Sequence, residues 1–278
     1  MSNESGHYYT IDGKSRHTQP TKKGAKNATR PTNVKDAREQ GLFPSVTGIT
    51  GVLSSPQLQR WREKQVVEAC YNVSPGPDET LEEYTEFALE RAFSGIKDAQ
   101  DIGTKIHAIL EDVYSGKGYD KEEGLVFPTS GETVAAARVI EPVIQAVEAL
   151  NIVPKECEAV VVNAKLGYAG TTDLPFVSND GTALGIADWK TKKTKPGETI
   201  YPSETYPMQI AAYVEAYWGG IGDVAIGHNI FISTTEPGRV EVVTYGSERL
   251  REELEVFKHC LAIWRKRNGY DPRRKGAV

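Results

Sequence analysis

The sequence predicts an α/β protein in which a helical region precedes a core of strands and helices. Residues 44–153 place apolar side chains at helical spacing, whereas residues after Pro154 fall into short β-branched runs separated by turn signals. After Pro154 the expected order is three strands, a helix, two strands and a helix. We therefore expect one domain over 44–278, with a helical region at 44–153 and an α/β core at 154–278.

Residues 1–43 are expected to form a basic arm that is extended or partly disordered. The segment is rich in Lys, Thr, Asn, Gly and Pro, and it shows no apolar periodicity. Between Gly13 and Arg38 there are eight Lys/Arg and one acid, and from Lys258 to Val278 there are seven and one. The net charge is −5, but segregated charge can leave a basic surface for phosphates on an acidic protein. Solubilising tails are the alternative.

Helix signals come first along the chain. Ser54 or Ser55 followed by Pro56 predicts a helix start, because proline suits the first helical position. This helix should run to about Ala69. Further helices are expected over 78–96, capped by Asp78, and over 101–114, 132–150, 205–218 and 247–267. Strands are expected over 159–163, 168–177, 183–191, 224–233 and 240–245.

Some classes of protein are disfavoured by composition. No run of 18 apolar residues exists, and Met1–Thr10 is polar, so we expect no membrane span, no signal peptide and a cytoplasmic location. For a phage-encoded protein that would be the host cytoplasm. The three cysteines are far apart and include no C-x-x-C pair, which favours reduced thiols and argues against zinc or an iron–sulfur cluster.

Charged residues in the expected strands carry the chemistry. Asp188 and Lys190 are two apart, so on a strand they face the same side. Asp173 lies in the preceding strand, and Glu158 comes directly before the strand ahead of that. Buried carboxylates usually pair or bind metal. An isolated D-x-K would be an ordinary ion pair, but the full set predicts a site.

Clustered carboxylates attract hard cations, so Mg²⁺ or Mn²⁺ is expected. Such a cation can lower the pKa of a bound water and neutralise charge on a phosphodiester. Lys190 would orient or help to activate that water, or would stabilise the developing negative charge; a role as a base is not required.

Two further pairs share helix faces. His107 and Glu111 are four apart, as are Gln209 and Tyr213. Imidazole is a good Mn²⁺ ligand, and the small Gly103 would permit close approach of another element. Gln209 and Tyr213 can bind phosphate, and tyrosine can stack on a base. Taken alone, each pair is better explained by core packing or solvated polar groups than by a functional role.

The order of these motifs resembles the RecB-like exonuclease branch of the PD-(D/E)XK nuclease superfamily. The motifs are Gly103-x-x-x-His107, Glu158, Gly170-x-x-Asp173, Asp188-x-Lys190 and Gln209-x-x-x-Tyr213. The match covers less than half of the chain. Small phage-type stand-alone nucleases and the mitochondrial genome-maintenance exonuclease are similar proteins of this kind. The resemblance implies a restriction-endonuclease-like core, a central mixed sheet flanked by helices.

The resemblance also implies roles for individual residues. Glu158, Asp173, Asp188 and Lys190 would be catalytic, with Glu156 as an alternative to Glu158. The metal would be held by His107, Asp173, Asp188 and the backbone carbonyl of Trp189. Contacts to DNA would come from Gln209 and Tyr213. Independently of the resemblance, Lys192 and Lys193 lie in a lysine-rich segment that would contact the DNA backbone. Relatives with an iron–sulfur cluster use four cysteines, and this chain has three.

The expected function is metal-dependent hydrolysis of DNA phosphodiester bonds, by an exonuclease that acts on single strands or ends. Four alternatives stay open: a structure-specific endonuclease on the same fold, an RNA-processing enzyme, a non-catalytic recombination accessory protein that binds DNA, and a hydrolase of small phosphoesters. A recombination or replication partner protein is conceivable, and the sequence does not indicate an oligomeric state.

Overall fold

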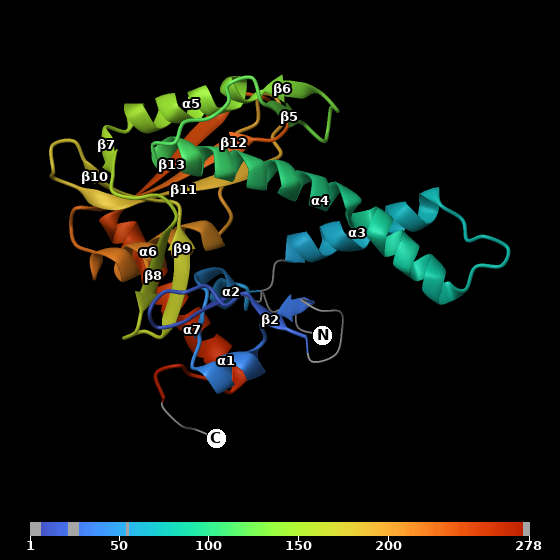
Figure 1. The fold of residues 1–278 in the computed structure, drawn as a ribbon, viewed down its shortest axis with the longest axis horizontal. Helices are drawn as coiled ribbons and strands as arrows, with labels where there is room; N and C mark the ends of the chain where they lie inside the picture. Colours follow the sequence, from blue (N-terminus) through green and yellow to red (C-terminus); the bar gives the residue numbers. More distant parts are fainter. Residues whose placement is uncertain (1–6, 22–27, 54–55, 275–278) are drawn as a thin grey trace.

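A five-stranded mixed sheet forms the centre of the protein (Figure 1). The computed structural model describes residues 7–21, 28–53 and 56–274. The strand order is β13-β12-β11-β10-β7, in which β11 and β12 run parallel and the other neighbours pair antiparallel. The strands are β7 (Ile152–Pro154), β10 (Leu174–Ser178), β11 (Leu184–Lys192), β12 (Ala225–Ser233) and β13 (Val240–Gly246).

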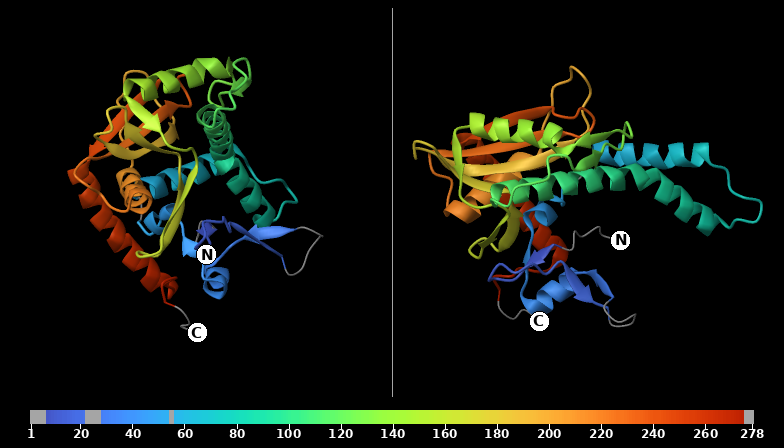
Figure 2. Two further views of the ribbon diagram at one scale, coloured as in Figure 1. Left: turned by 60° about the vertical axis from the view of Figure 1, so that its left-hand side comes forward. Right: turned by 45° about the horizontal axis from the view of Figure 1, so that its top comes forward.

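Helices cover both faces of this sheet (Figure 2). Ile186 of β11 packs with α6 and α7, whereas its neighbours Ala187 and Trp189 pack with α4 and α5. A strand whose two faces are both buried requires this pattern, because successive side chains point to opposite sides. The predicted α/β class, with a central mixed sheet between helices, is therefore confirmed. The helices are α4 (Leu81–Tyr114), α5 (Ala136–Ala149), α6 (Thr205–Trp218) and α7 (Ser247–Asn268).

α3 (Pro56–Asn72) and α4 form a long hairpin that projects from the body (Figures 1 and 2). α3 matches its prediction, although the cap expected at Ser54 or Ser55 lies outside the described residues. The prediction of two separate helices over 78–96 and 101–114 is wrong, because α4 is one continuous helix. No proline interrupts the chain between them. The cap is Thr80 rather than Asp78, since its hydroxyl accepts from the Glu83 backbone N–H.

The N-terminal residues contain more regular structure than their composition indicates. β1 (Tyr8–Tyr9) pairs with β4 (Phe43–Pro44), and β2 (Thr18–Pro20) pairs with β3 (Thr29–Pro31). Both tyrosines of β1 are buried. Two short helices follow β3, and the second begins where Ser45 caps it by accepting from the Gly48 N–H. They are α1 (Val34–Gln40) and α2 (Val46–Thr50).

The region before Pro154 also contains short strands. β5 (Gly124–Val126) pairs with β6 (Thr133–Ala135), so the helix expected from 132 begins only at Ala136. In the described parts of the chain, no helix combines the length and the hydropathy that crossing a bilayer requires.

The strand predicted over 168–177 is divided at Asp173. β9 (Tyr168–Thr172) pairs with β8 (Ala159–Asn163) in a separate two-stranded sheet, whereas β10 joins the central sheet. Asp173 is thus the residue at which the chain passes from one sheet to the other. The helices α6 and α7 and the strands β11, β12 and β13 lie within two residues of their predicted bounds.

Candidate active site

Asp173 is held beside β11 by the backbone. The Trp189 N–H donates to its Oδ2 at 2.6 Å. Leu174 is the register partner of Ala187, which brings the preceding residue, Asp173, next to Asp188. Burial raises the pKa of Asp173 well above its usual range, and the charge of Asp188 adds to the effect. Asp173 and Asp188, two acids of the predicted set, therefore lie next to each other.

Asp188 and Lys190 form a close ion pair on one face of β11. Lys190 Nζ lies 2.5 Å from Asp188 Oδ2. Asn229, on the parallel neighbour β12, donates its side-chain amide to the same oxygen at 3.0 Å. Tyr245 O–H donates in turn to Asn229 Oδ1 at 3.0 Å. The Asp188 carboxylate is consequently positioned from two sides.

The protonation of Lys190 follows from these neighbours. Burial lowers its pKa, but Asp188 and Asp173 together outweigh that effect and raise the pKa above its ordinary value. The Tyr206 ring lies on another side, with its centroid 5.2 Å from Nζ. Lys190 is therefore an ammonium group at neutral pH, which can donate hydrogen bonds to a phosphate or to water.

His107 reaches the site from α4. Its Nδ1 lies 4.0 Å from Asp173 Oδ1. The helix approaches β11 closely at Gly103, where a Cβ atom would stand 2.7 Å from Thr191 Oγ1. Gly103 thus allows the approach that brings His107 to the site. Burial lowers the pKa of His107, so the imidazole is neutral and can act as a ligand.

Glu158 directly precedes β8 and lies beside Asp173. Its φ of 53° is in the left-handed region, which is uncommon for a residue with a side chain. Its N–H donates to the Asp173 carbonyl at 2.9 Å. Burial raises the pKa of Glu158, and so does Glu111, one helical turn from His107 on α4. An unusual backbone conformation at a carboxylate of this kind is typical of functional sites.

Three of these residues form a group that could hold a metal ion. Ligand atoms of His107, Glu158 and Asp173 all lie within 4.8 Å of one another. Carboxylate oxygens with one imidazole suit Mg²⁺ or Mn²⁺. A divalent cation would also relieve the repulsion that raises the pKa of Asp173, so the residues present fit such an ion. Asp188 is adjacent but engaged by Lys190 and Asn229. The backbone carbonyl of Trp189 stays a prediction, and the Trp189 side chain is buried.

α6 lies against the other side of the site. Gln209 and Tyr213 are both buried, at 8% and 5% exposure. A Cβ atom at Gly170 would stand 2.7 Å from Tyr213 Cε1, so the small residue makes room for the ring. Roles for this pair in DNA binding stay predictions.

Lys192 and Lys193, the expected contacts to the DNA backbone, differ in their surroundings. Lys192 donates from Nζ to the Tyr201 carbonyl at 2.6 Å, whereas Lys193 is exposed. Lys193 is therefore free to reach a phosphate, and Lys192 is partly committed to the loop that follows β11.

Sequence reasoning missed three residues of the site. They are Asn229 behind Asp188, Tyr206 against Lys190, and Tyr9, whose O–H lies 3.0 Å from Thr171 Oγ1. Burial, and more weakly Glu158, raises the pKa of Tyr9. Asn229 could have been found as a polar residue within an apolar strand. Tyr206 lies one helical turn before Gln209 and Ile210, and that spacing was also visible.

Comparisons with known proteins add little to this geometry. Scans of protein families and of curated proteins find no match. Among solved structures, the chain is similar to the crystal structure of a "putative exonuclease" from Eubacterium rectale. The TM-score is 0.37 at 17% identity, over 62% of this chain and 68% of the other. The functional proposal therefore depends on the site itself.

Proposed function

We propose that the protein is a divalent-metal-dependent nuclease that hydrolyses phosphodiester bonds in DNA. The observation that carries the proposal is the convergence of His107, Glu158 and Asp173 beside the Asp188–Lys190 pair. One potential metal group next to one ammonium group matches the needs of phosphodiester hydrolysis, which are charge neutralisation and an oriented nucleophile. The order of the motifs also supports the RecB-like branch of the PD-(D/E)XK superfamily.

His107, Glu158 and Asp173 would hold Mg²⁺ or Mn²⁺, with Asp188 and the Trp189 carbonyl completing the set. When bound, such an ion lowers the pKa of water and offsets the charge of the phosphate. Lys190, held by Asp188 at 2.5 Å, would donate a hydrogen bond to the reacting water or to a phosphate oxygen. Asn229 would keep the Asp188 carboxylate in position through its 3.0 Å hydrogen bond.

The preferred substrate in this proposal is a DNA single strand or end. Lys193 is exposed at the end of β11 and would contact the phosphate backbone, and such contacts make binding fall steeply with salt. Gln209 and Tyr213 would hold the strand near the scissile phosphate. Exonuclease action is inferred from the family resemblance, so it is tested separately, by comparing linear with circular DNA.

The test compares linear and circular single-stranded DNA, each incubated with Mg²⁺, Mn²⁺ or EDTA. Wild-type protein is set beside Lys190→Ala and a matched control, Lys64→Ala, whose side chain is 71% exposed on α3. We expect degradation of the linear DNA alone, abolished by EDTA and by Lys190→Ala but unaffected by Lys64→Ala.

Each other outcome points elsewhere. Cutting of the circle as well would change the function to endonuclease at the same site. Salt-sensitive binding without turnover would favour the DNA-binding accessory protein. Metal-dependent cutting that survives Lys190→Ala would refute the assignment of the site.

A further inference from the structure

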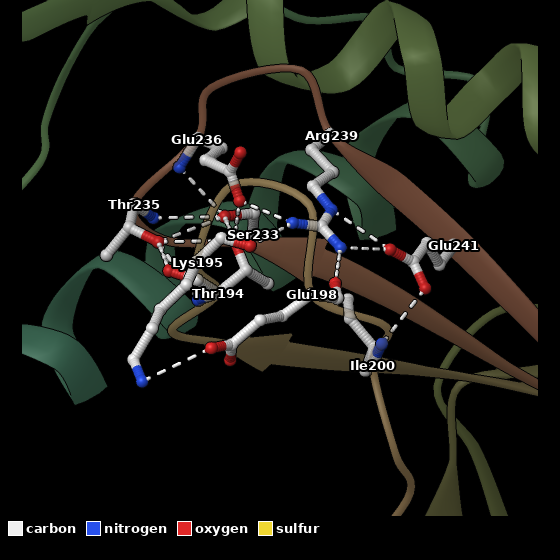
Figure 3. A network of polar contacts seen from close by, with 9 residues as sticks. All are labelled: Thr194, Lys195, Glu198, Ile200, Ser233, Thr235, Glu236, Arg239 and Glu241. Atoms are coloured by element: carbon white, nitrogen blue, oxygen red, sulfur yellow. Dashed lines mark hydrogen bonds and ion pairs between the residues drawn. The ribbon is translucent and has the colours of Figure 1, made fainter.

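The connection between β11 and α6, residues 193–204, is tied to the β12–β13 turn by polar side chains (Figure 3). Arg239 is central to this network. Its guanidinium donates to the carbonyl of Lys195 at 2.9 Å and to that of Glu198. Thr194 secures the start of the loop through a 2.6 Å hydrogen bond to Ser233, which is fully buried. The course of this irregular segment is therefore held by side chains from another part of the chain.

The end of the loop is anchored in a second way. Ile200 is buried, and its N–H donates to Glu241 Oε2 at 3.2 Å. Glu241 is itself paired with Arg239. The next residue, Tyr201, is 75% exposed, and its carbonyl accepts from Lys192 Nζ at 2.6 Å. Pro202 follows and restricts the Tyr201 backbone to extended conformations. The Tyr201 ring is thus presented to solvent on a fixed backbone.

Tyr201 is connected to the candidate active site through Lys192. Lys192, which binds its carbonyl, is two residues after Lys190 on β11, so both lysines project from the same face. Two residues of strand span roughly 7 Å. Lys190 and Lys192 are thus spaced along the strand by on the order of two nucleotides, at the roughly 3.4 Å spacing of a stacked strand.

The charge of the loop suits a nucleic-acid strand. Lys193 and Lys195 are exposed, and Glu198 offsets only Lys195, at 3.4 Å. A tyrosine among lysines offers both attractions that single strands use, stacking on the base and attraction to the phosphate. We propose that Tyr201 is a stacking platform for an unpaired base, and that it makes the site prefer single-stranded DNA over duplex. This inference rests on the proposed action on DNA.

Exposed tyrosines are common on protein surfaces. Tyr201 differs because three anchors fix the backbone on both sides of it, while its own ring is left uncovered. Only two side-chain torsions remain to be ordered on binding, which keeps the entropic cost of stacking small. A base within a duplex already stacks on its neighbours and cannot offer its face to the ring. The preference for single strands follows from that difference.

The experiment measures Kd in EDTA, so that binding is read without cleavage. The probes are a fluorescent single-stranded oligonucleotide, the same sequence as duplex, and an abasic single strand that keeps the phosphates. Wild-type protein is compared with Tyr201→Ala, with Tyr201→Phe, which keeps the ring, and with Tyr71→Ala. Tyr71 is the matched control, because it is 89% exposed on α3.

Tyr201→Ala should weaken binding of the single strand roughly 5- to 150-fold, the range that stacking of one base supports. Tyr201→Phe and Tyr71→Ala should stay within about twofold of wild type, and Tyr201→Ala should not change binding of the abasic strand or the duplex. Unchanged single-strand binding by Tyr201→Ala overturns the inference. So does an equal loss with the abasic strand, or an equal loss in Tyr71→Ala.

Failure of the proposed function looks different. Wild-type protein that binds single strands through Tyr201 but cuts nothing with Mg²⁺ or Mn²⁺ would refute the nuclease and leave the platform intact. Metal-dependent cutting together with unchanged binding by Tyr201→Ala would refute the platform alone. Wild-type protein that binds no single-stranded DNA would overturn the platform, and it would overturn the nuclease as well if no DNA is cut with Mg²⁺ or Mn²⁺.

Discussion

Asn229 donates a hydrogen bond to the Asp188 carboxylate at 3.0 Å from the neighbouring parallel strand. Both residues are buried, and Tyr245 O–H completes the chain by donating to Asn229. The carboxylate that pairs with Lys190 is therefore oriented by the neighbouring strand as well as by the lysine. Asn229 is a positioning residue, and its effect on function must act through Asp188.

We predict that Asn229→Ala lowers both stability and turnover. The substitution leaves Tyr245 O–H without its acceptor and removes the amide donor to Asp188, which keeps only Lys190, so the free energy of unfolding should fall by about 1–3 kcal/mol. The kcat on DNA should fall more than KM changes, because Asp188 and Lys190 lose their alignment. Tyr245→Phe is the control: it removes only the outer hydrogen bond and should have the smaller effect. A destabilised Asn229→Ala protein with wild-type kcat would restrict Asn229 to a structural role.

Because the backbone at Glu158 is left-handed, we predict that a glycine variant at this position is more stable than an alanine variant. With φ at 53°, alanine at this position keeps the strain, whereas glycine relieves it. In EDTA, Glu158→Gly should be more stable to denaturant than Glu158→Ala by roughly 1 kcal/mol. Both variants lack the carboxylate, so both should lose metal-dependent activity. Equal stability of the two variants would show that the backbone relaxes when the side chain is removed.

The raised pKa of Asp173 predicts that metal binding increases the stability of the fold. This pKa is raised by burial and by Asp188, so the folded state without metal binds a proton more readily than the unfolded state does. Without metal, stability should therefore decline as the pH rises above about 3.9, the ordinary pKa of aspartate. Binding of Mg²⁺ or Mn²⁺ should restore it.

Thermal unfolding of wild type and Asp173→Asn measures this link. In EDTA at neutral pH the variant should unfold at a higher temperature than wild type, because it removes an unfavourable buried charge. Adding Mn²⁺ should raise the Tm of wild type only. A variant that is less stable than wild type in EDTA would mean that the ionised Asp173 is well accommodated without metal.

The predictable part of the fold was the part with regular side-chain periodicity. α6 coincides with its predicted range because its apolar residues repeat at helical spacing, and β12 lies close to its range because it contains the β-branched and aromatic run Ile230-Phe231-Ile232. The N-terminal strands lacked such a pattern. Tyr9 is buried with Phe43 and Ala169 of β9, and Tyr8 is buried in the core that includes α6 and α7. These neighbours are distant in sequence, and local composition does not reveal such contacts.

The residues of the site also fall into a part that the sequence predicts and a part that it does not. Asp188 and Lys190 could be paired from their spacing alone, because a strand repeats every two residues. The break at Asp173 could not be predicted, since it depends on which sheet each half of the segment joins. Asn229 and Tyr206 needed the order of strands and the packing of α6. Spacing along one element is visible in a sequence, whereas neighbours across elements depend on topology.

From the burial of His228 we predict a loss of stability in mild acid that is independent of the proposed metal ligands. The ring is buried, stacks on Phe176 with centroids 5.3 Å apart, and bonds Thr244 Oγ1 through Nδ1 at 2.9 Å. Burial lowers the pKa of His228 to about 4. The unfolded chain takes up a proton below about pH 6.5, whereas the folded chain does so only near 4. The contribution of the neutral His228 to stability is therefore complete above pH 6.5 and is lost as the pH falls toward 4.

The size of this effect follows from linkage, at about 1.4 kcal/mol for each pH unit in that window. Denaturant unfolding at pH 7 and pH 5 should show a smaller acid-induced loss in His228→Gln than in wild type, even if the variant is less stable at both. His259→Gln, at an exposed position on α7, should keep the wild-type dependence. An identical loss in all three proteins would mean that water or a local rearrangement lets the folded state accept the proton at His228.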